Sequence, residues 1–216
     1  MLLDLKLDGK TVIVVGGGSE AYRKTQSFVD SGAKIWVISK EFSSGIQKLG
    51  ADKKAALLKT EIGDAKSFVD SLNPKPDMLL AITNDAKLNF ELVKAAKSAG
   101  CMVYAVDNPA LSDFILPAVA RVGDVKVAVS TGGKSPAMAR VLRQRIEKLV
   151  TPEDLLEIEL QAKIRSILKK QVSDSKVKSK LLYEILNNDN IKQALREGKL
   201  QEAEKMALKL VEEKQK

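Results

Sequence analysis

The sequence predicts an α/β protein in which a doubly wound parallel sheet is followed by a β-hairpin with one helix and then by an all-helical C-terminal region. The first observation is a regular alternation of short apolar runs and helical patterns, which favours parallel strands joined by right-handed crossovers. The second is a change of rhythm after Asp107, where two apolar runs flank Gly123-Asp124. The third is a row of amphipathic patterns from Thr151 onward.

The first half of the chain supplies the strands of the predicted parallel sheet. Five short runs are β-rich or continuously apolar, as strands buried on both faces are: residues 11–15, 34–39, 55–60, 77–83 and 101–106. Helical patterns lie between them, at residues 19–31, 42–49, 64–72 and 85–98. We therefore expect these five strands to form one sheet.

The second half changes architecture. The runs FILPAVARV and VKVAVST predict an antiparallel hairpin, with Pro117 at an edge or a bulge. A helix is expected over residues 136–150, and Thr151 and Pro152 mark the start of the next one as N-cap and first helical residue. Two further amphipathic pieces cover residues 176–186 and 192–211. We divide the chain into regions 1–112, 113–150 and 151–216.

The composition limits the available chemistry. The sequence has no histidine, so a proton acceptor has to be Asp, Glu, Lys, Tyr or a held water, and a histidine-ligated metal site is excluded. The single cysteine, Cys101, rules out an internal disulfide or a thiolate cluster held by this chain alone, and we expect it in the core. No metal site is predicted. The net charge of +8 fits an anionic partner and a solvated basic surface equally well.

Several partners are not expected. No apolar run approaches the ~18 to 20 residues that span a bilayer, and the first ten residues lack the features of a signal peptide. We therefore expect a cytoplasmic protein without a membrane partner. Aromatic residues make up only 4% of the chain and no nucleic-acid-binding motif is present, so we expect no nucleic-acid partner.

A glycine turn follows the first predicted strand. In TVIVVGGGSEA, Gly16, Gly18 and Ala21 form the pattern G-x-G-x-x-A directly after a strand and before a helix, which is the context of the dinucleotide-binding fingerprint. Gly16 permits the tight turn, Gly18 lets the backbone approach a pyrophosphate, and Ala21 lets the helix pack on the strand. The context favours a Rossmann-type nucleotide-binding sheet over a purely structural turn.

The end of the second strand leaves the choice between NAD and NADP open. The fingerprint calls for an acidic residue there to bind the adenosine ribose. Here Ser39 and Lys40 end the strand, and Glu41 comes one step later. Ser39 or Glu41 could accept hydrogen bonds from the ribose, whereas Lys40 would favour a 2′-phosphate.

Polar residues also end the fourth strand, where open α/β sheets place ligand-contacting loops. The segment AITNDAKLN carries Thr83, Asn84 and Asp85 at this point, and we expect them beside the cofactor. Asp85 is also a natural N-cap for the following helix, which explains its presence equally well.

Asp107 ends the fifth strand, on the same carboxyl edge of the sheet as the glycine turn. In a chain without histidine, a carboxylate at this place is the best-positioned proton acceptor. The alternative, of equal weight on the residues alone, is a turn-forming Asp ahead of Asn108-Pro109. Asp113 is a second candidate of lower rank.

The segment AVSTGGKSPAMARVLRQR contains Gly-Lys-Ser, as a P-loop does. A P-loop also needs glycine five residues before that Gly-Lys pair, where this chain has Ala128 inside a strand. Ser135 and Pro136 instead suit the N-cap and the first position of a helix. The preceding turn, residues 131–135, would then offer free amides to an anion. The alternative is a turn needed only for packing or dimer contact.

These segments resemble the precorrin-2 dehydrogenase module of siroheme synthases, a family that includes stand-alone dehydrogenases and a bifunctional fungal enzyme. The resemblance covers residues 5–149. It is most specific in a strand-end Asp followed by F-I-x-P-A and then by V-A-[VI]-S-[ST]-G-G-x-S-P-x-x-A-R. Residues 150–216 resemble the family only in kind.

The resemblance implies an NAD-dependent oxidation of precorrin-2 to sirohydrochlorin in siroheme biosynthesis. It places the catalytic aspartate at Asp107 and makes residues 113–150 a dimerisation region that is exchanged between the subunits of a homodimer. It places the contacts to NAD at Gly16, Gly18, Ser19, Glu20, Lys40 and Glu41. Some members also act as ferrochelatases, an activity left open here because iron insertion without histidine would rest on Asp107.

The implied substrate is a polyanion, because precorrin-2 carries eight carboxylates, and a basic chain would select such a ligand. We expect the glycine turn and the helix after it to bind it, through Thr131, Gly132, Gly133, Lys134, Ser135 and Arg140.

The alternative function is an NAD(H)-sensing Rossmann module that binds the nucleotide without catalysis, like those that regulate potassium uptake. The segment ITNDAKLN fits such modules also. They normally end the second strand with an acidic residue, however, and do not need a G-G-x-S-P helix start.

Overall fold

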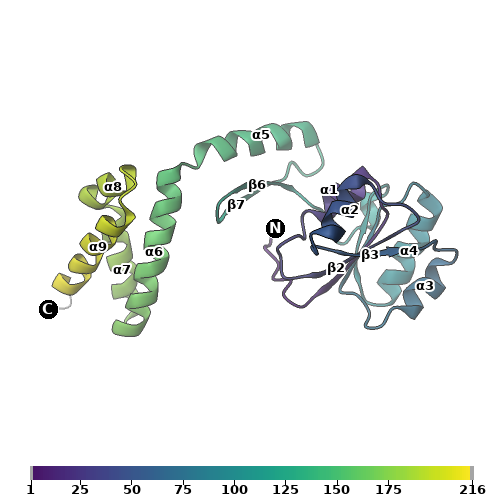
Figure 1. Ribbon diagram of the computed structural model, residues 1–216, viewed down its shortest axis with the longest axis horizontal. Coiled ribbons are helices and arrows are strands. Elements are labelled where there is room, and N and C mark those ends of the chain that lie inside the picture. Colours follow the sequence, from purple (N-terminus) through teal and green to yellow (C-terminus); the bar gives the residue numbers. More distant parts are fainter. Residues whose placement is uncertain (1, 215–216) are drawn as a thin grey trace. The chain divides into compact units, whose positions relative to one another are not determined.

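The computed structural model describes residues 2–214, which form two compact units (Figure 1). The first unit ends at Leu116 and the second begins at Pro117. The first unit therefore extends beyond the boundary predicted at residue 112, because Phe114 and Leu116 pack against an apolar cluster of the sheet. The hairpin and the C-terminal helices belong together to the second unit. No helix among residues 2–214 has the length and apolarity to cross a membrane.

The first unit is a doubly wound parallel sheet with strand order β3-β2-β1-β4-β5. Its strands are β1 (Thr11–Val15), β2 (Lys34–Ser39), β3 (Ala56–Lys59), β4 (Met78–Ala81) and β5 (Met102–Ala105). The helices between them are α1 (Ser19–Thr25), α2 (Ser44–Ala51), α3 (Ala65–Ser71) and α4 (Ala86–Ser98), and a short 3-10 turn, η1 (Pro109–Leu111), follows β5. The strand order reverses direction between β1 and β4, which confirms the predicted fold class.

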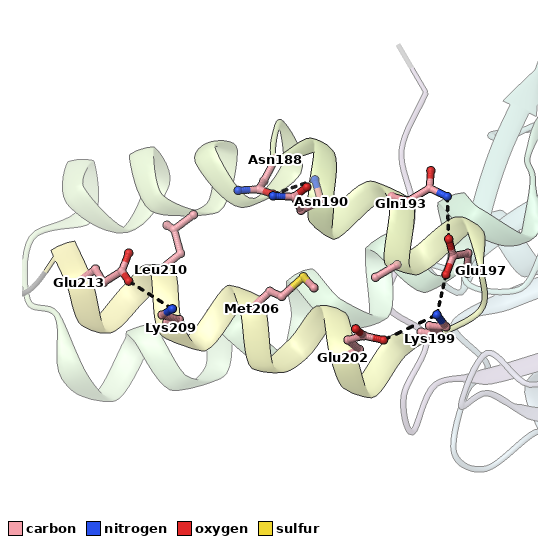
Figure 2. Close-up of a pocket in the computed structure, with 11 residues that line it drawn as sticks. Asn188, Asn190, Gln193, Glu197, Lys199, Glu202, Met206, Lys209, Leu210 and Glu213 are labelled. Atoms are coloured by element: carbon pink, nitrogen blue, oxygen red, sulfur yellow. Dashed lines mark hydrogen bonds and ion pairs between the residues drawn. The ribbon is translucent and has the colours of Figure 1, made fainter.

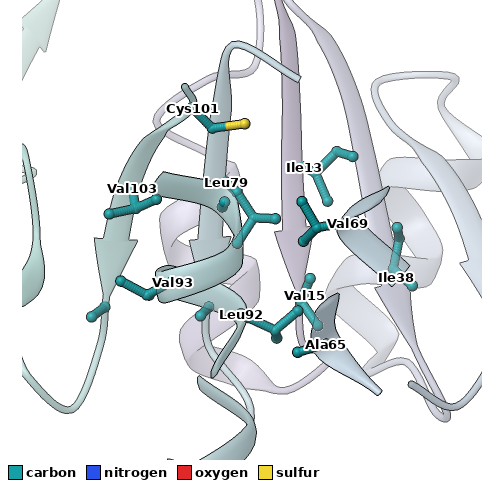
Figure 3. Packing of buried hydrophobic residues seen from close by; sticks show 13 residues of the cluster. Ile13, Val15, Ile38, Ala65, Val69, Leu79, Leu92, Val93, Cys101 and Val103 are labelled. Carbon is teal, nitrogen blue, oxygen red and sulfur yellow. The ribbon is translucent and has the colours of Figure 1, made fainter. Parts of the chain in front are cut away.

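Alternation along the strands builds a core on each face of the sheet. Ile13 and Val15 pack with α3 and α4, whereas Val12 and Val14 pack with α1 and α2. Each such buried aliphatic side chain contributes about 1.5 to 3 kcal/mol relative to exposure. Figure 3 shows the first of these clusters, with Cys101 inside it. Cys101 is only 5% exposed, which confirms its predicted place in the core, and this burial raises the pKa of its thiol.

Helix α1 is shorter than the predicted segment 19–31, because it ends at Thr25. The hydroxyl of Thr25 donates to the carbonyl of Ala21 at 2.7 Å, a local bond that competes with helix continuation. Asp30 and Gly32 then have φ values of +60° and +81°, which a right-handed helix cannot contain.

The second unit begins with the predicted hairpin, β6 (Ala118–Val122) and β7 (Val125–Val129), whose strands pair antiparallel. Strand β6 starts directly after Pro117, so the proline lies outside the strand rather than within it; it has no N–H for the ladder. Gly123 turns the hairpin with φ +55°. Helix α5 (Pro136–Leu149) lies along the hairpin (Figure 1).

Four helices complete the second unit: α6 (Pro152–Gln171), α7 (Ser175–Leu186), α8 (Asp189–Arg196) and α9 (Leu200–Lys214). The predicted start of α6 is confirmed, because Thr151 and Asp154 form a capping box. The single helical piece expected over residues 192–211 is wrong, since α8 ends before Gly198, whose φ of +73° permits a tight connection to α9. Leu160, Ile164 and Leu168 of α6 are fully buried in the helical core.

Asp77 connects the starts of β1 and β4. Its carboxylate accepts a hydrogen bond from the Thr11 N–H at 2.8 Å and one from the Lys10 ammonium at 2.8 Å. The bond from Lys10, followed by the bond from Thr11, lowers the pKa of Asp77. Because the pKa is lowered in the folded state, this contribution to stability is present above the pKa of the unfolded chain and is lost as the pH falls through the lowered value.

We expect Asp77→Asn to lower the urea midpoint of the first unit at pH 7, and the difference from wild type to shrink in acid, where Asp77 of the wild type becomes protonated. The fluorescence of Trp36, the single tryptophan, reports this unit because Trp36 lies in β2. Asp4→Asn, at an exposed position, is the control. A difference that stays constant between pH 7 and pH 3 would contradict the assigned pKa direction.

Candidate functional site

A cavity of about 850 Å³ lies at the carboxyl edge of the first unit, where the strand order reverses between β1 and β4. Ligands of open α/β sheets bind in the crevice at such a reversal. The loops after β1, β2, β3 and β4 form its walls. All ten residues predicted to bind the cofactor line it: Gly16, Gly18, Ser19, Glu20, Ser39, Lys40, Glu41, Thr83, Asn84 and Asp85.

The first two residues of the glycine turn, Gly16 and Gly17, pack too closely on their neighbours for any side chain. A Cβ on Gly16, which has φ +134°, would lie 2.1 Å from the Ile82 carbonyl oxygen. A Cβ on Gly17 would lie 1.8 Å from the carbonyl oxygen of Glu41, and Ser43 donates its N–H to the Gly17 carbonyl at 2.8 Å. The turn is therefore joined to the ends of both β4 and β2.

Gly18 differs from these two glycines because nothing in the protein requires it. A Cβ at this position would have no heavy atom within 4 Å. The residue is exposed, lines the cavity, and precedes the first turn of α1, whose amides have no acceptor within the helix. This geometry leaves room for a diphosphate against the backbone and fits a dinucleotide.

The end of β2 carries paired charges. Lys40 Nζ lies 2.5 Å from the Glu61 carboxylate, and both side chains are about two-thirds exposed and line the cavity. A 2′-phosphate would therefore meet a lysine that already has a partner, beside the carboxylates of Glu41 and Glu61. Glu20 is engaged as well, since its carboxylate pairs with Arg23 and Lys24 of its own helix.

Sequence reasoning missed Asn89, which links the cofactor cavity to the predicted base. Its side chain, only 1% exposed, hydrogen-bonds the backbone N–H, hydroxyl and carbonyl of Thr83. Its Nδ2 also donates to the Asp107 carboxylate at 3.2 Å. Asp107 is exposed and does not itself line the cavity. The sequence feature that could have indicated Asn89 is its position on the apolar face of the predicted helix, at helical spacing from Leu92 and Ala96.

The other two candidate aspartates, Asp85 and Asp113, are held by hydrogen bonds with local structural roles, and Asp113 lies beside the start of β5 rather than at its end. Asp85 N-caps α4 by accepting the Leu88 N–H at 3.0 Å, so the capping interpretation of this residue is confirmed. Asp113 accepts the Val103 N–H and lies 2.9 Å from the Lys97 ammonium. The bond from Lys97 lowers the pKa of Asp113, which weakens it as a proton acceptor and favours Asp107.

The predicted substrate segment lies in the second unit. Ser135 N-caps α5 and Pro136 follows it, as expected. The expectation of free amides throughout residues 131–135 is wrong, because three of them are donated within the turn. The N–H groups of Gly132 and Ser135 bond the hydroxyls of Ser130 and Thr131, and the N–H of Lys134 bonds the Thr131 carbonyl. The side chains of Lys134 and Arg140 are exposed.

A second cavity, of about 490 Å³, lies between α8 and α9 (Figure 2). Figure 2 shows that its charged side chains pair with one another. Lys199 contacts Glu197 at 2.7 Å and Glu202 at 4.0 Å, and Lys209 contacts Glu213 at 3.9 Å. None of the site residues predicted from the sequence lies there, and both lysines of its lining already pair with carboxylates, so it is not our candidate site.

Two family models match the chain. One, described as NAD(P)-binding, covers residues 3–118, and the other, described as the central part of a sirohaem biosynthesis protein, covers residues 122–149. Among solved structures, SirC, a precorrin-2 dehydrogenase, superposes with a TM-score of 0.74 over 97% of this chain and 99% of its own. At 23% sequence identity this likeness shows the fold.

Curated relatives are similar to this chain over most of its length. The precorrin-2 dehydrogenase of Methanosarcina barkeri is 31% identical over 88% of this chain and 84% of its own length. The siroheme synthases of Psychromonas ingrahamii and Methylococcus capsulatus are 28% and 33% identical, and this chain spans 41% and 42% of their lengths. With a family model over more than half of its length and a relative matched along most of both chains, this protein belongs to the precorrin-2 dehydrogenase and siroheme synthase family.

Proposed function

We propose that this chain is a precorrin-2 dehydrogenase, which oxidises precorrin-2 to sirohydrochlorin with NAD as a step of siroheme biosynthesis. Its relative in Methanosarcina barkeri, matched over 84% of that protein, bears this name. The observation that carries the proposal is the hydrogen-bonded connection from Thr83, in the wall of the cofactor cavity, through Asn89 to the carboxylate of Asp107. This connection links the cofactor site to the proposed proton acceptor.

The residues around the cavity fit a dinucleotide. The open backbone at Gly18 would face the diphosphate, and Ser39 and Glu41 would accept hydrogen bonds from ribose hydroxyls. The Lys40–Glu61 pair favours NAD over NADP, because a 2′-phosphate would have to compete with Glu61 for the lysine. When bound, the nicotinamide accepts the hydride that leaves the substrate.

Asp107 is the proposed base. Removal of a hydride from precorrin-2 requires a proton to leave as well, and this loss of two hydrogens extends the conjugation of the macrocycle. The Asp107 carboxylate is exposed, so it can reach a substrate proton and pass it on to solvent. Asn89 binds only one of its oxygens, which leaves the other available.

The substrate carboxylates are assigned to the turn before α5 and the first part of that helix. The exposed side chains of Lys134 and Arg140 supply the positive charge. Thr131, Gly132, Gly133 and Ser135 shape the turn that holds Lys134. Because the amides are mostly donated within the turn, charge and hydroxyl groups carry the proposed recognition.

We also propose a homodimer that exchanges the region 113–150. Exposed apolar side chains on α5 support this assignment, because Met138, Val141 and Leu149 are 45%, 37% and 73% exposed in the single chain. A ferrochelatase activity stays open, and the cytoplasmic location expected from the sequence stays a prediction.

The defining experiment incubates the purified protein with precorrin-2 and either NAD or NADP, and follows sirohydrochlorin by absorbance. We expect product with NAD, and less with NADP at equal concentration. Binding of NAD without any sirohydrochlorin would overturn the proposal in favour of a nucleotide-sensing module. A parallel reaction with ferrous iron reports chelation separately.

We expect Asp107→Asn to retain NAD binding and to lower kcat by about 100-fold or more, since general-base catalysis contributes at least that much. The amide has nearly the same shape, and its oxygen can still accept the bond from Asn89. Isothermal titration measures NAD binding and absorbance measures turnover. Asp113→Asn, at the other carboxylate, is the comparison, and a larger loss there than in Asp107→Asn would reverse the assignment of the base.

Arg140→Ala should raise KM for precorrin-2 about two- to fivefold, in line with the loss of one exposed charge pair. The effect should grow at low ionic strength, where screening is weaker, while the NAD affinity stays unchanged. Arg165→Ala removes an exposed arginine from α6 of the same unit and controls for net charge. Equal KM values in the two variants would remove Arg140 from the substrate site.

A further inference from the structure

Asn89 is a polar side chain on the buried face of α4. This face otherwise carries Leu92, Val93 and Ala96, all buried against the sheet. Among residues 2–214, Asn89 and Thr25 are the two polar residues that are buried as completely as the core. Removing an amide from water is unfavourable unless every donor and acceptor finds a partner, so the bonds that Asn89 makes explain why it can occupy this position.

The hydrogen bonds define the orientation of the Asn89 amide. The backbone N–H of Thr83 can only donate, so the amide oxygen must face it, at 3.0 Å; the same oxygen accepts the Thr83 hydroxyl at 2.7 Å. The NH2 group is thereby directed to the Thr83 carbonyl, at 3.0 Å, and to Asp107 Oδ2, at 3.2 Å. The amide oxygen thus binds only the cofactor loop, which is the loop of residues 82–85 after β4. The NH2 group binds both this loop and Asp107, the proposed base.

We propose that Asn89 is a positioning residue for the dehydrogenation, which holds the cofactor loop at Thr83 and the carboxylate of Asp107 in one fixed relation. This inference rests on the proposed function, in which Asp107 accepts the substrate proton. Asn89 is buried and outside the cavity lining, so it acts through these two residues rather than on substrate or cofactor.

The exposed position of Asp107 makes such a support necessary. Within the described part of the chain, the bond from Asn89 is the one side-chain hydrogen bond that the Asp107 carboxylate makes. Without it, the carboxylate would rotate freely in solvent after the end of β5. A reacting group displaced by about 1 Å can lose about 100-fold in rate, so one bond to a rigid helix has a large effect on turnover.

Two substitutions at this position separate the two ends of the amide. Asn89→Ala removes every bond, whereas Asn89→Asp keeps the shape and the acceptors for the Thr83 N–H and hydroxyl. It replaces the NH2 donor to Asp107 and to the Thr83 carbonyl by a carboxylate oxygen. We expect kcat to fall about 10- to 100-fold in both variants, with little change in KM for precorrin-2. We expect the dissociation constant for NAD, measured by isothermal titration, to rise more in Asn89→Ala than in Asn89→Asp.

A similar loss of kcat in both variants with a different loss of NAD affinity distinguishes positioning from a general loss of structure. A general loss of structure would weaken NAD binding and turnover in parallel. Thr25→Val is the matched control, because it removes another fully buried side-chain hydrogen bond of the same unit, from Thr25 to the Ala21 carbonyl, without touching Thr83 or Asp107. It should leave kcat and NAD affinity unchanged.

The outcomes separate this inference from the proposed function. An active wild-type protein whose Asn89 variants keep the wild-type kcat, or lose kcat only in proportion to NAD affinity, overturns the positioning role alone. A wild-type protein that produces no sirohydrochlorin overturns the proposed function, and the role of Asn89 with it.

Discussion

The site of the first unit depends on the close approach of Gly16 to the carbonyl of Ile82. A Cβ on residue 16 would lie 2.1 Å from that oxygen, and φ at Gly16 is +134°, so only glycine allows the contact. Any larger residue would push the ends of β1 and β4 apart. The contact holds the glycine turn beside the point where the strand order reverses, between β1 and β4, so that Gly18 lines the cavity. The geometry of the cofactor site is therefore a property of the backbone.

The parallel register brings the proposed base to the same edge. Ala81 of β4 is paired with Ala105 of β5, and Thr83 and Asp107 each follow their strand by two residues. The crossover between these strands is α4, so a residue near its start is adjacent to both strand ends. Asn89 occupies that place and bonds both residues. The relation of cofactor loop to base thus follows from one strand pair and the helix that joins it.

Local patterns predicted most of the fold because the strands and the caps are local features. The apolar runs of β1 and β2 and the capping residues Ser135 and Thr151 lie where expected. The role of Asn89 could not be predicted, because its bond to Asp107 spans 18 residues and depends on how α4 packs. The same limit applies to the pairing of Lys40 with Glu61, which belong to neighbouring strand ends.

The two units differ in how they can recognise negative charge. The glycine turn after β1 keeps its backbone exposed at Gly18, where no side chain competes for it. In the turn before α5, the hydroxyls of Ser130 and Thr131 accept the amides of Gly132 and Ser135, so the backbone has less to offer an anion. Long basic side chains then remain for the proposed substrate. Such side chains can adapt to carboxylates on flexible arms, whereas a rigid backbone turn suits the constant geometry of a diphosphate.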